Sequence, residues 1–108
     1  MQRPQPPPLE ARSSELRLRV ATLNVWALPE PLAEAVGARM AAIGQRLRDL
    51  ELDLVAFQEV WTPAARAQLL RSGLEAGLLH AWEPDSHFAS SGLLVLSRLP
   101  IRSARFEP

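Results

Sequence analysis

The segment from residue 16 to residue 60 places an amphipathic stretch between two apolar runs of strand length. The first run, LRLRVATLNVW (16–26), alternates in polarity at its start, and the second, LDLVAFQEV (52–60), is nearly continuous, so we predict two strands. Between about 32 and 50, apolar residues recur at spacings of four, three, four and three, which predicts a helix: Val36, Met40, Ile43, Leu47 and Leu50. A strand-helix-strand unit has parallel strands with a right-handed crossover, so both carboxyl ends lie at one edge of the sheet.

Polar side chains fall near the end of both predicted strands. Asn24 lies near the end of the first and Glu59 near the end of the second. Ligands bind at the carboxyl edge of open α/β sheets. We expect Asn24 and Glu59 to face away from the crossover helix and to be neighbours. In this assignment the outer face carries Val20, Thr22, Val55 and Phe57, and the helix covers Leu23, Val25, Leu54 and Ala56.

A carboxylate in a cleft walled by Val55, Phe57 and Trp61 would be costly to keep ionised without a positive partner. A divalent cation supplies one, and carboxylate and amide oxygens are hard ligands suited to Mg²⁺ or Mn²⁺. Glu59 and Asn24 are therefore candidate metal ligands. The alternative is that both residues only cap their strands by hydrogen bonding to loop amides, and the spacing does not decide between the two.

The remainder of the chain predicts one helix and two short strands. Thr62 is a good N-cap, Pro63 suits the first helical position and Gly77 can end the helix. LLHAWEP predicts a brief strand, and GLLVLSRLPI (92–101) predicts another that Pro100 interrupts. The expected order is β-α-β-α-β-β, an α/β arrangement.

Composition excludes several classes of protein. The 108 residues are 47% hydrophobic, and twelve basic residues balance twelve acidic ones, so there is a core but no general positive field for nucleic acid. The absence of cysteine excludes disulfides and thiolate metal sites. Residues 1–15 are rich in proline and predict a disordered leader. We see neither a signal peptide nor a transmembrane run, and expect a cytoplasmic location by default; the oligomeric state is open.

Four blocks in order, LRVATLNVW, RMAAIGQRL, LDLVAFQEVW and SGLLVLSRLPI, resemble the first half of the endonuclease/exonuclease/phosphatase superfamily. The resemblance implies a two-sheet α/β sandwich, of which residues 16–108 would be the N-terminal, truncated part, inactive alone. It also implies that Asn24 and Glu59 are active-site residues, with Glu59 binding the catalytic Mg²⁺ and Asn24 hydrogen bonding or coordinating around metal and phosphate.

The implied reaction is attack of an activated water on a phosphoester, and the blocks most resemble the neutral sphingomyelinase-like branch. A phospholipid head group is thus the favoured substrate. A nuclease of the same superfamily, with nucleic acid as substrate, or an interaction module without chemistry, remains an alternative. We assign no catalytic role to His80 or to residues 85–87 (Asp85, Ser86 and His87), and we expect Trp26 and Trp61 to be core aromatics.

Overall fold

The computed structural model describes residues 15–29, 35–84 and 91–107, so most of the predicted leader lies outside the described residues. The elements follow the expected β-α-β-α-β-β order, and the α/β fold class is confirmed. The first strand is shorter than predicted at its start, and the residues before 35 that we assigned to the first helix are not described. The elements are β1 (Val20–Ala27), α2 (Val36–Leu50), β2 (Leu54–Val60), α3 (Pro63–Glu75), β3 (His80–Trp82) and β4 (Leu94–Ser97).

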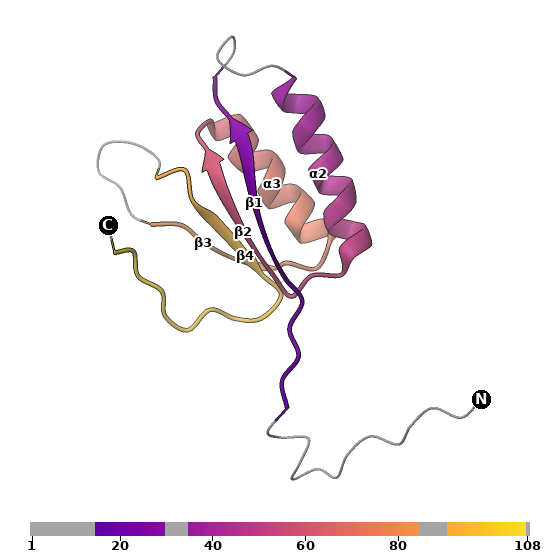
Figure 1. Ribbon diagram of the computed structural model, residues 1–108, viewed down its shortest axis with the longest axis vertical. Helices are drawn as coiled ribbons and strands as arrows, with labels where there is room; N and C mark the ends of the chain where they lie inside the picture. The colour runs from indigo at the N-terminus through magenta and orange to yellow at the C-terminus, as the bar shows by residue number, and fades with distance from the viewer. Residues whose placement is uncertain (1–14, 30–34, 85–90, 108) are drawn as a thin grey trace, which may run out of the picture.

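The four strands form one sheet in the order β1-β2-β4-β3. β1 and β2 are parallel, as a helical crossover requires, whereas β4 runs antiparallel to both β2 and β3. Figure 1 shows α2 and α3 side by side on one face of this sheet. The carboxyl ends of β1 and β2 therefore lie together at one edge.

Helix α3 has the end structures that its sequence predicts. The Thr62 hydroxyl accepts a hydrogen bond from the backbone N–H of Ala65 at 3.1 Å, and proline occupies the first helical turn. At the other end Gly77 has a φ of 85°. The N–H of Leu78 donates to the Gly73 carbonyl at 2.8 Å, which is the bond that defines a Schellman end.

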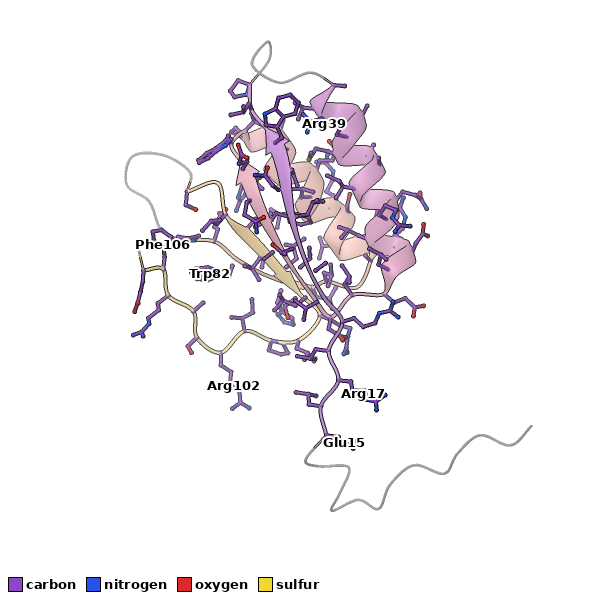
Figure 2. The ribbon with its side chains drawn as sticks, in the orientation of Figure 1. Glu15, Arg17, Arg39, Trp82, Arg102 and Phe106 are labelled. Carbon is purple, nitrogen blue, oxygen red and sulfur yellow. The ribbon has the colours of Figure 1, made fainter. Side chains whose placement is uncertain are left out.

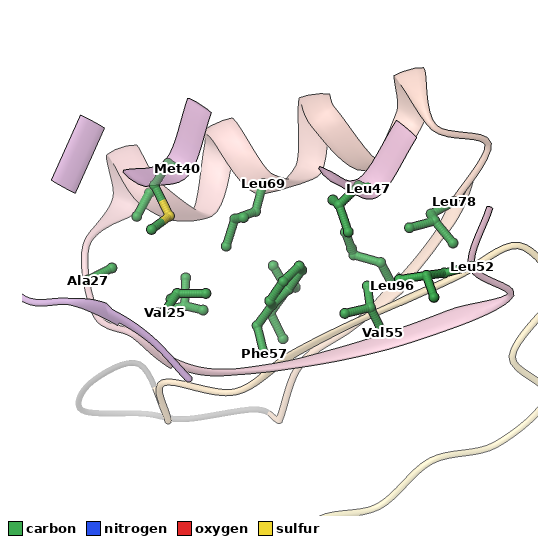
Figure 3. Packing of buried hydrophobic residues seen from close by; sticks show 13 residues of the cluster. Val25, Ala27, Met40, Leu47, Leu52, Val55, Phe57, Leu69, Leu78 and Leu96 are labelled. Atoms are coloured by element: carbon green, nitrogen blue, oxygen red, sulfur yellow. The ribbon is translucent and has the colours of Figure 1, made fainter. Parts of the chain in front are cut away.

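The core lies between the sheet and the two helices (Figure 3). Val55 and Phe57 are each 1% exposed and pack on this side, with Met40 of α2 and Leu69 of α3. Our assignment of Val55 and Phe57 to the face away from the helices is therefore wrong. The physical reason is that β2 is apolar on both faces, so alternation alone does not identify which face the helices cover.

Asp53 anchors the opposite, amino-terminal end of β2. Its carboxylate accepts the backbone N–H of Arg19 at 2.8 Å and the Nε–H of Arg98 at 2.7 Å. These two bonds hold the pKa of Asp53 below its usual value. The bond from the backbone N–H of Arg19 has the larger effect on the pKa, and the bond from the Arg98 side chain the next. The carboxylate thus fixes β2 between the residues that enter β1 and leave β4.

Candidate functional site

The regular pairing of β1 and β2 breaks at the carboxyl edge. Residues pair one to one as far as Asn24 with Gln58, and pairing resumes at Ala27 with Val60, so two residues of β1 lie opposite one of β2. Trp26 has a φ of 49° and Glu59 a φ of 60°. This left-handed conformation costs a non-glycine residue about 1–2 kcal/mol, and it persists only where the surroundings hold it.

The left-handed turn at Glu59 brings its side chain to Asn24. Strict alternation along β2 would place residue 59 on the helix side with Phe57. Instead the Asn24 side-chain amide donates a hydrogen bond from Nδ2 to Glu59 Oε2. The two residues are neighbours, as we predicted, but a break in alternation produces the contact and not the alternation that we assumed.

The orientation of the Asn24 amide follows from its second partner. Its Oδ1 accepts a hydrogen bond from the backbone N–H of Trp26 at 3.0 Å. An N–H can only donate, so the oxygen of the amide must face Trp26 and the nitrogen must face Glu59. Asn24 therefore orients the carboxylate, and its own oxygen is engaged by the backbone.

Arg39 of α2 reaches the same strand end, as its position beside the end of β1 in Figure 2 illustrates. Its guanidinium donates to the Val25 carbonyl at 2.5 Å and to the Trp26 carbonyl at 3.0 Å, and lies 4.9 Å from the centroid of the Trp26 ring. Arg39 is not among the site residues that we predicted from the sequence. Its position beside the apolar stripe, three residues after Val36, was the only signal of this contact.

Two exposed tryptophans lie beside Glu59, one in β1 and one just after β2. Trp26 is 48% and Trp61 39% exposed, so our prediction that both are core aromatics is wrong. Trp61 packs on Gly92, where an added Cβ would lie 2.7 Å from the indole ring. Gly92 has a φ of 77°. The Val60 N–H donates to the Gly92 carbonyl at 2.9 Å, which ties this loop to the strand end.

The surroundings of Glu59 differ from the apolar cleft that we predicted. Glu59 is only partly buried, and the side chains of Val55 and Phe57 face the helices. The need to neutralise a deeply buried charge is therefore no argument for a cation here. In the described ranges no three His, Cys, Asp or Glu side chains gather as a metal-binding group.

The donor set still fits one kind of cation. The Glu59 carboxylate has one oxygen bonded to Asn24 and is accessible to solvent. Mg²⁺ commonly takes one or two protein carboxylates and completes its shell with water and phosphate oxygens, whereas Zn²⁺ needs several protein ligands. A site with one oriented carboxylate suits Mg²⁺ or Mn²⁺ and does not suit a structural zinc ion.

His80 lies far from this edge along the sheet. It pairs with Ser97, which in turn pairs with Leu54 at the start of β2, the end opposite Glu59. Asp85, Ser86 and His87 fall outside the described residues. Neither of the helices in the described part of the chain is long and apolar enough to cross a membrane.

Residues 21–108 match the sequence model of the Endonuclease/Exonuclease/phosphatase family. The chain belongs to this family. Its fold is similar to that of a solved structure, a beta hairpin deletion mutant of beta toxin from Staphylococcus aureus, with a TM-score of 0.67 and 22% identity over 84% of this chain and 39% of that one. The four-stranded sheet with two helices is thus a fold shared with part of a larger protein.

Two curated relatives have sequences similar to most of this chain. A Drosophila melanogaster protein named "Putative neutral sphingomyelinase" is 37% identical over 92 residues, which are 85% of this chain and 20% of that protein. Sphingomyelin phosphodiesterase 2 of Rattus norvegicus is 35% identical over 92 residues, 81% of this chain and 20% of the relative. The chain therefore spans about a fifth of the length of these relatives.

Proposed function

We propose that this chain supplies the cation-binding carboxylate of a divalent-metal-dependent phosphodiesterase that hydrolyses a sphingomyelin-type lipid. The observation that carries the proposal is the contact between Asn24 and Glu59 at the adjoining carboxyl ends of β1 and β2. The family and the names of the relatives support the phosphodiesterase class and the lipid substrate.

In this proposal each residue has a distinct role. Glu59 binds Mg²⁺ or Mn²⁺ through its carboxylate, and Asn24 holds that carboxylate in one orientation through Nδ2. A bound cation polarises a phosphoryl oxygen and stabilises the leaving oxygen. Asn24 turns Nδ2 toward the carboxylate, so we assign it the orienting role first; its Oδ1 accepts the Trp26 N–H with one lone pair and keeps a second that can contribute to a cation.

The exposed aromatic side chains at this edge are consistent with a substrate that has apolar chains. Trp26 and Trp61 are both partly open to solvent, and tryptophan is suited to the boundary between an apolar phase and water. The balanced charge of the chain, twelve basic and twelve acidic residues, gives no corresponding support to a nucleic-acid substrate.

The test is hydrolysis by the protein that contains this chain. Release of phosphocholine from choline-labelled sphingomyelin in detergent micelles should require Mg²⁺ and should be lost in Glu59→Gln. Glu51→Gln is the matched control, because Glu51 is also a glutamate in the left-handed conformation, with a φ of 51°, but is exposed and follows α2 at the other end of the sheet. Full activity in Glu59→Gln would refute the proposal. Nicking of DNA without lipid hydrolysis would show that the substrate is nucleic acid and not a lipid.

A further inference from the structure

The guanidinium of Arg39 bonds to two successive peptide groups of β1. The carbonyl of Val25 belongs to the peptide group before Trp26, and the carbonyl of Trp26 to the one after it. The φ and ψ angles of residue 26 are the rotations that separate these two groups. A single planar fork that holds both carbonyls therefore fixes the backbone of Trp26 in its left-handed conformation.

The same peptide group connects Arg39 to the site. Its carbonyl oxygen, on Val25, accepts from Arg39, and its N–H, on Trp26, donates to Asn24 Oδ1 at 3.0 Å. The other end of the Asn24 amide donates to Glu59. Arg39, the peptide group, Asn24 and Glu59 thus form one continuous chain of hydrogen bonds, in which each bond polarises the next.

We propose that Arg39 is a positioning residue that sets the orientation of the Glu59 carboxylate through this chain of hydrogen bonds. It acts by holding the strained Trp26 backbone, and its stacking on the Trp26 ring adds to that hold. The inference rests on the proposed function only in giving the carboxylate a cation to bind.

The first measurement needs no metal. In NMR spectra of the ¹⁵N-labelled chain, Arg39→Gln should shift the Trp26 backbone amide and the Asn24 side-chain amide. Arg48→Gln is the matched control: Arg48 is on the same helix, carries the same charge and forms an exposed ion pair of 2.7 Å with Glu75. The control should leave both signals in place. Unchanged Trp26 and Asn24 signals in Arg39→Gln would overturn the inference.

The second measurement is affinity for Mn²⁺, followed by paramagnetic broadening of amide signals near Glu59. Loss of a residue that orients a metal ligand typically costs 10–100-fold in affinity, so Arg39→Gln should bind at least about tenfold more weakly than wild type. Arg39→Lys should restore only part of this loss, because lysine keeps the charge but has no planar fork. Equal affinities in wild type, Arg39→Gln and Arg48→Gln would show that Arg39 has a structural role alone and would overturn the inference.

The wild-type chain provides a test that does not depend on whether a variant folds. The Arg39 guanidinium protons should exchange slowly with water and show ring-current shifts and nuclear Overhauser contacts to the Trp26 indole. Absence of these contacts overturns the inference. Absence of Mn²⁺ broadening in wild type would instead refute the proposed function, and the metal-free spectra would still decide whether Arg39 orients Asn24.

Discussion

The left-handed conformation of Glu59 can be tested by comparing the stabilities of its alanine and glycine variants. Glycine should be the more stable of the two at a left-handed residue, and alanine in an ordinary strand. Glu59→Ala and Glu59→Gly both remove the carboxylate and its bond to Asn24, so the difference between them reports the backbone alone. At a φ of 60° alanine keeps the strain of about 1–2 kcal/mol that glycine relieves. Glycine loses about 0.5–1 kcal/mol through the greater freedom of its unfolded chain.

The balance leaves the glycine variant more stable by roughly 0.5–1 kcal/mol, or about 2–4 °C in Tm for a chain of this size. In an extended strand the order is reversed, since glycine there is less stable than alanine by about 0.5–1 kcal/mol. Urea unfolding followed by circular dichroism measures the difference.

Two controls show both signs in the same chain. The pair Glu51→Ala and Glu51→Gly, at a φ of 51°, should repeat the preference for glycine. Ala56→Gly, in the regular part of β2 three residues before Glu59, should destabilise the chain. If Glu59→Ala is as stable as Glu59→Gly or more so, while both controls behave as stated, Glu59 is not left-handed and our explanation of the site is wrong.

Three further predictions concern the scaffold of the site. Leu47→Ala, at a side chain 4% exposed, should cost about 2–5 kcal/mol in urea unfolding, and a loss below 1 kcal/mol would contradict its place in the core. Gly92→Ala adds both left-handed strain and a clash with the Trp61 ring, so it should cost roughly 2 kcal/mol or more; a neutral result would contradict the packing. Asp53→Asn removes a carboxylate with a lowered pKa, whose contribution is present above the usual aspartate pKa and lost as pH falls through the folded value. The stability gap between wild type and this variant should therefore close on acidification, and a gap independent of pH would exclude the assigned bonds.

The parts of the fold that the sequence predicted correctly are those set by local chemistry. The apolar spacing from Val36 to Leu50 predicted α2, and Thr62, Pro63 and Gly77 predicted both ends of α3. In each case the residue acts on backbone groups within a few positions of itself, so the relevant information is contiguous in the sequence.

The parts that were wrong depend on contacts distant in the sequence. The side of β2 that the helices cover could not be read from Val55 and Phe57, because Leu54 and Ala56 on the other side are also apolar. No residue pattern predicted a left-handed glutamate at position 59, because glycine is the residue that ordinarily adopts this conformation.

The contact of Arg39 with β1 could not be predicted from the sequence either. An arginine next to an apolar stripe ordinarily keeps its charge in water, with its stem along the stripe. In this chain the guanidinium instead donates hydrogen bonds to the carbonyls of Val25 and Trp26. Both carbonyls lie within the register shift between Asn24 and Ala27. The contact of this side chain with β1 therefore depends on an irregularity in strand pairing, which the sequence does not show.

We propose that the ends of β1 and β2 present one oriented carboxylate to a divalent cation. A Mn²⁺ titration of the ¹⁵N-labelled chain examines this arrangement, because paramagnetic broadening locates the bound ion. We expect broadening centred on residues 24–26 and 58–60, competition by Mg²⁺, loss of the broadening in Glu59→Gln and its retention in Glu51→Gln. Broadening that is centred elsewhere, or that persists unchanged in Glu59→Gln, would contradict it.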